Sequence, residues 1–329
     1  MQIEVERFPI AGRFTIARGS KTEAVVVTVK LVATVNGSQV QGWGECVPYT
    51  RYGETVDGVV KALESIRDSV EAGADRLSVQ TLLPRGAARN ALDCAFWDLE
   101  AKLTGVPAYR RAEVAAPRSV TTAYTISLDE PSAMAASVLR AIDRRILKVK
   151  LGGSGGDLER IRAIREAAPH ATLIADANEG WTEENLDEHL FACAEAGFSL
   201  IEQPLPAARD EFLRQRGPSA VPLCADESVH DRAGLERLRG LYQVVNIKLD
   251  KTGGLTEALL MAREAEQLGF RIMVGCMVGT SLSMAPAFLL AGRAEFVDLD
   301  GPLLLARDRD NGLSYERSVI CPPEPTLWG

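Results

Sequence analysis

Residues 172–230 contain three short apolar runs, and each run ends at a carboxylate: TLIAD (172–176), SLIE (199–202) and VPLCAD (221–226). Longer stretches with helical patterning separate such runs along the chain, as at 158–167 and 256–268. Short apolar strands that alternate with helices are typical of parallel sheets built from βα units. This segment therefore predicts the α/β fold class.

The same unit continues on both sides of this segment. Further strands are predicted at 147–151, 244–249, 271–274 and 296–299. By subtraction, the strand ends lie 26, 26, 24, 22, 27 and 23 residues apart, at Lys150, Asp176, Glu202, Asp226, Lys248, Gly275 and Asp298. This is close to one βα unit, because a barrel of roughly 250 residues divides into eight units of about 30. The spacing predicts a TIM-like (β/α) barrel with charged strand ends at its open face. An open doubly wound sheet, the alternative, would draw its site from fewer loops.

The first part of the chain has a different character. A β-branched run at 23–35, the turn Asn36-Gly37 and a return strand at 39–44 predict a hairpin. Helical patterns follow at 56–71 and 85–103, and the second ends before Gly105 and Pro107. Strands followed by helices indicate an α+β domain. We place it at 1–115 and the barrel at 116–310.

Composition and charge exclude several classes of function. With 46% hydrophobic and 25% charged residues, the 329-residue chain has the composition of a globular protein. A net charge of −8 without a basic run argues against nucleic-acid and membrane-surface partners. No stretch approaches the roughly 18 apolar residues of a spanning helix, and the start MQIEVERFPIAGRF lacks the pattern of a signal peptide. We expect a cytoplasmic protein, and the six scattered cysteines fit a reducing compartment.

Three strand-end carboxylates, Asp176, Glu202 and Asp226, have no histidine or cysteine beside them in the pattern. All-oxygen ligation is typical of hard cations, and Mg²⁺ in particular uses few protein carboxylates and keeps positions for water and substrate. Each residue alone could instead cap the following helix. Three at successive strand ends favour a Mg²⁺ site.

Three lysines add acid–base chemistry to this prediction. Lys148 and Lys150 are two apart on one strand and therefore point to the same face, while Lys248 ends a strand four further on. In a closed barrel, Lys150 and Lys248 would face each other across the mouth. One could remove a proton from one face of a substrate while the other returns a proton to the opposite face. The alternative for Lys248 is an ion pair with Asp226 or Asp250.

With these lysines and carboxylates the chain resembles the enolase superfamily, in which a lysine base works beside Mg²⁺. Within the superfamily it resembles the muconate-lactonizing subgroup. Segments along nearly the whole chain look like those of bacterial L-Ala-D/L-Glu epimerases: GWGECVPYTRYGE, GAARNALDCAFWDLEAKLTG, KVKLGG, DANEGW, IEQPLP, ADESVH, VNIKLDKTGGLTEAL and VDLDGP. The resemblance implies a modified (β/α)7β barrel covered by the N-terminal α+β capping domain, which a C-terminal segment at about 311–329 completes. It also implies epimerisation of the C-terminal residue of a dipeptide, L-Ala-D-Glu to L-Ala-L-Glu, by two-lysine 1,1-proton transfer through a metal-stabilised enolate.

The resemblance also assigns roles at the catalytic centre. Lys150 and Lys248 match the two acid/base lysines, and Lys148 matches the lysine that supports Lys150 and the substrate carboxylate. The metal ligands are the three strand-end carboxylates already named, Asp176, Glu202 and Asp226.

Other residues are matched to the two ends of the substrate. Asp298 and Asp300 match the D-x-D that holds the dipeptide's α-ammonium. Arg18, in the first flexible loop, resembles the arginine proposed for the far carboxylate, with Lys21 nearby as an alternative; either could be a solvated loop charge. The pocket is expected to be completed by one residue of the first barrel strand and three of a second mobile loop: Thr125, and Tyr49, Arg51 and Tyr52.

Two other kinds of function stay open. An N-acylamino-acid racemase, an o-succinylbenzoate synthase or a cycloisomerase would share the lysines and the carboxylates, but none of them binds a cationic amine, so the D-x-D argues against them. A barrel that binds ligands without turnover would be expected to lack a lysine or a metal ligand. The expected partner is a small dipeptide, and the physiological role implied is murein-peptide recycling. A homo-oligomer is compatible with the sequence.

Overall fold

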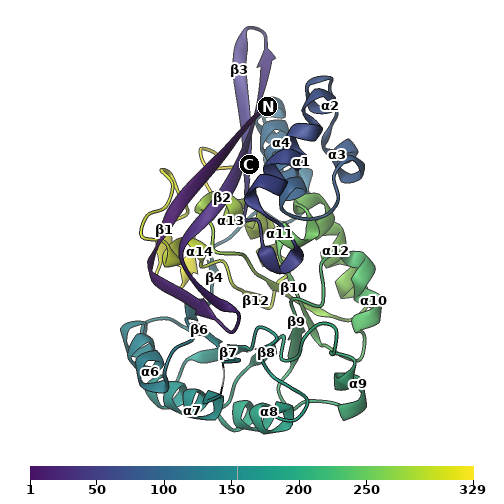
Figure 1. Ribbon diagram of the computed structural model, residues 1–329. Helices are drawn as coiled ribbons and strands as arrows, with labels where there is room; N and C mark the ends of the chain where they lie inside the picture. Colours follow the sequence, from purple (N-terminus) through teal and green to yellow (C-terminus); the bar gives the residue numbers. More distant parts are fainter. Residues whose placement is uncertain (154) are drawn as a thin grey trace.

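Eight parallel strands form the centre of the barrel in the computed structural model, which describes residues 1–153 and 155–329. They lie side by side in chain order (Figure 1). A backbone hydrogen bond of 2.8 Å from Ala123 N to Val297 O links the two edges of the sheet. The strands are β5 (Tyr124–Ile126), β6 (Ile146–Lys150), β7 (Thr172–Asp176), β8 (Leu200–Glu202), β9 (Leu223–Ala225), β10 (Val244–Ile247), β11 (Arg271–Val274) and β12 (Phe296–Val297).

A helix follows each of the first seven strands, which confirms the predicted (β/α)7β order. These are α6 (Pro131–Arg140), α7 (Asp157–Ala167), α8 (Leu186–Glu195), α9 (Phe212–Arg216), α10 (Leu235–Leu238), α12 (Leu255–Gln267) and α13 (Ser281–Ala287). Shorter elements are α11 (Leu249–Thr252), α14 (Gly301–Leu304), η2 (Arg232–Gly234) and η3 (Phe288–Arg293). Among the described residues, no helix is both long and apolar enough to cross a membrane.

The alternation of side chains along the strands separates the apolar core from the polar site. On β6, Leu147 and Val149 pack into the large apolar core, while Lys148 and Lys150 point the other way. A separate buried apolar layer takes one residue from, or next to, seven of the strands: Ala123, Ile174, Leu200, Cys224, Val244, Met273 and Phe296. This layer fills the barrel below the polar strand ends, in keeping with the packed interior of such barrels. The chemistry is therefore confined to the carboxyl ends of the strands.

The N-terminal part pairs a three-stranded antiparallel sheet with helices. The strands are β1 (Gln2–Ile16), β2 (Gly19–Val35) and β3 (Ser38–Cys46), and the helices are α1 (Val56–Ser65), α2 (Arg67–Glu71), α3 (Arg76–Leu82), α4 (Ala87–Thr104) and α5 (Ala108–Arg111). The predicted hairpin turn is present, with positive φ at Asn36 (50°) and Gly37 (79°). Helix α4 lies so close to β3 that a Cβ at Gly42 or Gly44 would come within 2.3 Å of its backbone.

Some predicted boundaries were wrong. The single helix expected at 56–71 is broken at Ile66, and the helix expected from residue 85 begins at Ala87. The strand expected at 244–249 ends at Ile247, because Lys248 already caps α11. Arg18, by contrast, lies in a loop as expected, in the turn at the tip of the β1–β2 hairpin, where Ile16 pairs with Gly19. Such ends depend on tertiary packing more than on local pattern.

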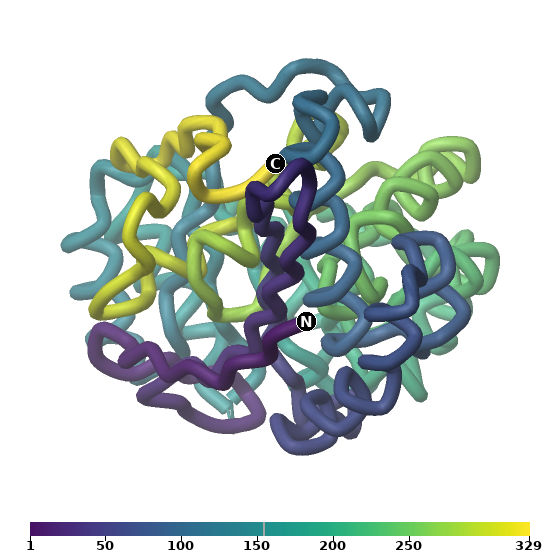
Figure 2. The backbone as a smooth tube through the Cα atoms, turned by 90° about the horizontal axis from the view of Figure 1, so that it is seen from above, coloured from purple at the N-terminus to yellow at the C-terminus, as the bar shows by residue number. Residues whose placement is uncertain are grey.

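The C-terminal residues return to the N-terminal part. Trp328 Nε1 donates to Cys94 O on α4 (3.0 Å), and the Gly329 N–H donates to Asp98 (2.7 Å). In Figure 2 the C-terminus accordingly lies beside segments drawn in purple and blue. A small antiparallel sheet joins β4 (Val120–Thr121), β13 (Tyr315–Glu316) and β14 (Val319–Ile320).

Candidate active site

A cavity of about 730 Å³ opens at the carboxyl ends of the barrel strands. Eleven of the thirteen residues predicted for the site line it: Arg18, Tyr49, Arg51, Tyr52, Thr125, Lys148, Lys150, Asp226, Lys248, Asp298 and Asp300. The other two, Asp176 and Glu202, are fully buried at the ends of β7 and β8. The N-terminal hairpin and the barrel strands up to β12 therefore contribute to the same cavity.

Lys148 lies at the centre of the buried charges. Its Nζ is 2.7 Å from Glu202 Oε2, 2.7 Å from Asp298 Oδ2 and 3.2 Å from Asp176 Oδ2. Burial lowers the pKa of Lys148, but the three carboxylates, Asp298 first, outweigh burial and hold it well above its usual value. This direction favours the positively charged form of Lys148, which lines the cavity.

Lys150 and Lys248 lie at the ends of strands four apart, and both line the cavity. Lys150 Nζ is 2.6 Å from Asp176 Oδ2, and Lys248 Nζ is 2.7 Å from Asp226 Oδ2. The ion pair considered as the alternative for Lys248 is therefore present, with Asp226 as its partner. Burial lowers the pKa of Lys248, but the charge of Asp226 outweighs burial, so that the pKa lies well above the usual value. Lys150 and Lys248 are thus paired with different carboxylates.

Asp176, Glu202 and Asp226 fit a divalent cation by type and position, although their carboxylates are paired with lysines in this structure. As the side chains stand, no group of three Asp, Glu, His or Cys residues in the described part of the chain is arranged to hold a metal ion. Burial and the nearby charge of Asp176 raise the pKa of Glu202 to about 7, and Glu202 Oε2 lacks a hydrogen-bond partner although Lys148 lies near it. An under-satisfied buried oxygen among carboxylates on adjacent strands is what an oxygen-ligated cation would satisfy. Mg²⁺ therefore fits this set of oxygen donors, and it would replace the lysine ammonium groups as their partner.

Asp298 and Asp300 form a second acidic group, after β12. Asp298 Oδ2 accepts from Lys148, while its buried Oδ1 has no hydrogen-bond partner among the described residues. Asp300 Oδ2 accepts from the backbone N–H of Thr125 at 2.6 Å. Burial, followed by the charge of Asp298, raises the pKa of Asp300 to about 7. The free oxygen of Asp298 leaves an acceptor for a cationic group in the cavity.

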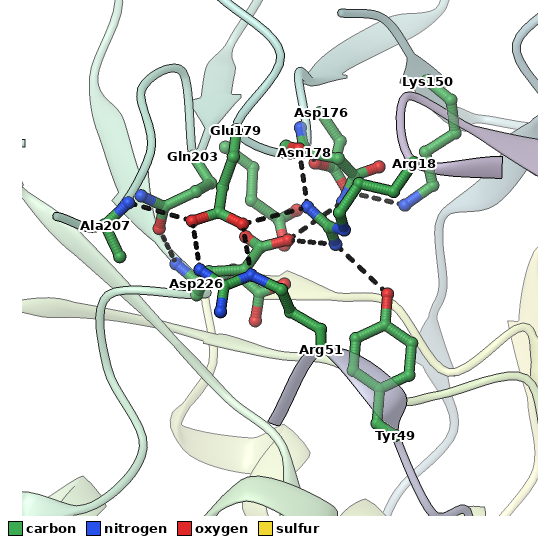
Figure 3. A network of polar contacts seen from close by, with 12 residues as sticks. Arg18, Tyr49, Arg51, Lys150, Asp176, Asn178, Glu179, Gln203, Ala207 and Asp226 are labelled. Carbon is green, nitrogen blue, oxygen red and sulfur yellow. Dashed lines mark hydrogen bonds and ion pairs between the residues drawn. The ribbon is translucent and has the colours of Figure 1, made fainter. Parts of the chain in front are cut away.

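The hairpin tip reaches over the cavity and is held there by Arg18. Its Nη1 donates to Asn178 O (2.6 Å) and to Glu179 Oε2 (3.2 Å). Its Nη2 donates to Glu227 Oε1 (2.6 Å) and to the Tyr49 hydroxyl (3.1 Å). Figure 3 shows these contacts converging on one guanidinium group. Arg18 thus joins the tip to the loops after β7 and β9.

The second loop, around the 3₁₀ helix η1 (Thr50–Tyr52), is held by a similar contact. Arg51 makes two hydrogen bonds of 2.7 Å to Glu179, beside those of Arg18 (Figure 3). Asn178 and Glu179 both have positive φ, 46° and 67°, which is uncommon for residues other than glycine. Tyr52 faces the cavity and packs edge-on against His230, with ring centroids 4.7 Å apart.

Several residues of the site were missed from the sequence. Lys251 is buried and donates to Asp226 Oδ1 (2.5 Å), and Asn246 donates to Glu202 Oε1 (2.8 Å). Asn246 could have been found, because it lies two residues before Lys248 and so faces the same side of the strand. Glu179 and Glu227 follow predicted ligands closely in DANEG and ADES, but nothing in the sequence pairs them with Arg18.

Both parts of the chain match known family models. Residues 133–315 match the enolase C-terminal domain-like family, and residues 2–110 match the N-terminal domain of mandelate racemase/muconate lactonizing enzyme. The chain therefore belongs to the enolase superfamily, as its motifs suggested.

Two similar proteins are an epimerase and a racemase. The chain is 45% identical to the L-Ala-D/L-Glu epimerase of Escherichia coli (strain K12), over 94% of this chain and 95% of that protein. It is 46% identical to an N-acetyl-D-glutamate racemase of Pseudoalteromonas sp, over 91% and 95%.

Solved structures show the same likeness. An enolase family member from Agrobacterium tumefaciens with homology to dipeptide epimerases, with bound sodium, L-Ala-L-Glu and an ordered loop, has a TM-score of 0.96 and 53% identity and covers 100% of this chain and 99% of its own. A dipeptide epimerase from Enterococcus faecalis V583, in complex with Mg and L-Leu-L-Tyr, has a TM-score of 0.90 and 28% identity and covers 98% and 96%.

Proposed function

We propose that this protein is a Mg²⁺-dependent dipeptide epimerase that interconverts L-Ala-D-Glu and L-Ala-L-Glu. The observation that carries the proposal is the placement of Lys150 and Lys248 at the ends of strands four apart, both lining one cavity with the free oxygen of Asp298. The similarity to the E. coli epimerase and to the structure with L-Ala-L-Glu supports the same substrate.

The residues divide the work between binding and proton transfer. Asp298 and Asp300 hold the α-ammonium of the dipeptide. Asp176, Glu202 and Asp226 would hold Mg²⁺, which when bound supplies positive charge beside the substrate carboxylate. Lys148 adds a positive charge, so that the negative charge that develops as the α-proton leaves is stabilised by groups already in place.

Two bases are needed because epimerisation inverts the α-carbon. Lys150 removes the proton from one face and Lys248 delivers one to the other, and the roles exchange in the reverse direction. One lysine must be neutral and the other protonated at the start of each turnover. The proton in the product therefore comes from a lysine that has exchanged with water, so solvent deuterium should enter the product.

Racemisation of an N-acylated glutamate is the second candidate, and the similarity to the N-acetyl-D-glutamate racemase favours it. An acylated amine carries no charge, however, and would leave the free Oδ1 of Asp298 and the carboxyl group of Asp300 without a cationic ligand. Changing Asp298 to Asn separates the two candidates. It should weaken turnover of dipeptides far more than that of N-acetylglutamate if the dipeptide is the natural substrate.

The test of this function is ¹H NMR of L-Ala-D-Glu, L-Ala-L-Glu and N-acetyl-D-glutamate in D₂O. With Mg²⁺ we expect the glutamyl α-proton signal of the dipeptides to disappear while the other diastereomer forms, and with EDTA neither change. Exchange of N-acetylglutamate alone would favour the second candidate. No exchange in any substrate would contradict both.

The wider setting is part of the same proposal. We place the enzyme in the cytoplasm, where small dipeptides from murein recycling would be its substrates, and a homo-oligomer is compatible with it. We also retain the division into a capping domain at 1–115, completed by about 311–329, and a barrel at 116–310. The contacts of Trp328 and Gly329 with α4 support the completed cap.

A further inference from the structure

The second loop is closed on itself by hydrogen bonds between its first and last residues. The Tyr49 N–H donates to Glu54 Oε2 at 3.0 Å. In return, Tyr49 O accepts from the N–H groups of Tyr52 (2.9 Å) and Glu54 (3.4 Å). Gly53 makes the turn between them with a φ of 77°, a left-handed conformation that suits glycine. The Glu54 side chain therefore fixes the start of the loop to its end.

The other oxygen of Glu54 fixes the loop to helix α4. Glu54 Oε1 accepts from the N–H of Ala87, the first residue of α4, at 2.7 Å. The first N–H groups of a helix have no partner within the helix, and the helix dipole favours a carboxylate beside them. Gly86, the residue before α4, has no side chain that could accept these bonds. Glu54 therefore caps the helix from a different segment of the chain.

Gly86 also leaves the space that this contact needs. Its φ is 126°, and a Cβ at this position would clash with Glu54 Oε1. Any other residue at position 86 would therefore push the carboxylate away from the Ala87 N–H.

The residues that Glu54 holds reach the active site, although Glu54 itself does not. Tyr49, Arg51 and Tyr52 line the cavity, whereas its described lining residues do not include Glu54. The Tyr49 hydroxyl accepts from Arg18 Nη2 at 3.1 Å, and the Tyr49 and Tyr52 rings meet edge to face with centroids 5.2 Å apart. A shift of Tyr49 would therefore be felt by both segments that cover the cavity.

We propose that Glu54 is a positioning residue that holds the second loop in the conformation in which Arg51 and Tyr52 cover the bound substrate. It acts through the backbone N–H groups of Tyr49 and Ala87 and does not touch the reacting atoms. This inference rests on the proposed dipeptide epimerase activity, since its effect is measured on that reaction.

The first test compares Glu54→Ala with Asp75→Ala, which also removes a carboxylate from the start of a helix. Asp75 caps α3 by accepting from the Ser78 N–H at 2.8 Å. Both variants should lose some stability, because each leaves a helix start without its acceptor. Only Glu54→Ala should raise the KM for L-Ala-L-Glu, by about tenfold, with kcat within about threefold of wild type, because a loosened loop weakens binding more than proton transfer.

Amide hydrogen exchange provides a second measurement that does not depend on turnover. The N–H groups of Tyr49 and Ala87 both donate to Glu54. In Glu54→Ala these two amides should exchange about tenfold faster than in wild type, because local opening no longer breaks their hydrogen bonds. In Asp75→Ala their exchange should stay as in wild type.

Gly86→Ala tests the same contact without changing Glu54. The added methyl group should displace the carboxylate and raise the KM as Glu54→Ala does. Gly73→Ala is the control, because Gly73 also has a positive φ (104°) but has no atom within 4 Å of its Cβ position. It should have the backbone strain of the first variant and a wild-type KM.

Each outcome decides the assignment. A wild-type KM in Glu54→Ala or in Gly86→Ala would overturn it, and so would an equal rise of KM in Asp75→Ala. Unchanged exchange of the Tyr49 amide in Glu54→Ala would also contradict it. If the wild-type protein turned over neither L-Ala-L-Glu nor L-Ala-D-Glu, the proposed function itself would be wrong, and the exchange measurement would still show whether Glu54 holds the loop.

Discussion

The barrel end of the active site and its cover, which consists of the β1–β2 hairpin tip and the second loop around η1, hold their charges in different ways. At the barrel end, the side chains of Lys148 and Asp176 are 1% and 0% exposed. On the cover, those of Arg18 and Arg51 are 26% and 39% exposed, although they pair with carboxylates at 8% or less. Removing one partner of a buried ion pair costs several kcal/mol of folding free energy, whereas an exposed pair contributes little to stability. The barrel should therefore determine the chemistry, and the cover should adjust binding.

The largest effect is expected at the metal ligands. Glu202→Gln removes one carboxylate charge but keeps a side chain that can accept from Asn246. We expect kcat/KM to fall about 10³-fold, because cation stabilisation of a developing charge contributes several kcal/mol. Mg²⁺ should also raise the Tm of the wild type but not that of the variant. Glu211→Gln, at an exposed surface pair, is the control and should keep both properties.

A large effect on stability is expected where a buried carboxylate depends on one arginine. Arg309 donates to Glu45 (2.7 and 2.9 Å) and to Glu6 (2.6 Å), and Glu45 is fully buried. Arg309→Met should lower the free energy of unfolding by about 3–5 kcal/mol. Urea denaturation measures this, and Arg271→Met, whose partner Glu295 is exposed, should cost less than about 1 kcal/mol. Equal losses in the two variants would contradict the contrast between buried and exposed pairs.

A smaller effect is expected on the cover. Arg51→Met removes the two hydrogen bonds to Glu179 but leaves Glu179 paired with Arg18. The second loop should then close less often, and KM should rise less than about tenfold with kcat nearly unchanged. Steady-state kinetics with L-Ala-L-Glu checks this. A fall in kcat as large as that in Glu202→Gln would place Arg51 in the chemistry and break the comparison.

The smallest effect concerns pH and His230, which packs against Tyr52. Burial, with the charges of Lys251 and Arg85, lowers the pKa of His230 from 6.5 to about 4. Between these values the unfolded chain binds a proton that the folded protein does not, so stability is lost as pH falls from 6.5 to about 4. His230→Asn should therefore show a smaller drop in Tm from about pH 7 to about pH 4.5 than wild type. His170→Asn, at an exposed position, should not reduce the drop.

The two regions also differ in how far the sequence predicts them. The barrel strands repeat at a regular interval with polar ends, and this interval alone is enough to place Lys150, Asp176 and Lys248 at one mouth of the barrel. On the cover, Arg18 meets Glu227 across 209 residues of chain, and no local pattern connects them. The sequence also could not show that Lys148 lies between Asp176 and Glu202, because that position depends on side-chain rotamers.

The missed residues follow the same division. Asn246 lies on a predicted strand, and the two-residue alternation would have found it. Glu179 and Glu227, by contrast, are connected to Arg18 only by tertiary contacts, which no local pattern predicts.

The central claim, that two lysines act on opposite faces of one carbon, is tested most directly by hydrogen exchange in single variants. Lys150→Ala and Lys248→Ala are incubated with L-Ala-D-Glu and with L-Ala-L-Glu in D₂O with Mg²⁺, and the glutamyl α-proton is followed by ¹H NMR. We predict that both variants lose epimerisation by about 10²-fold or more, and that each still exchanges the α-proton of one epimer, a different one in each variant. Exchange of both epimers by either variant, or of the same epimer by both, would contradict the two-base mechanism.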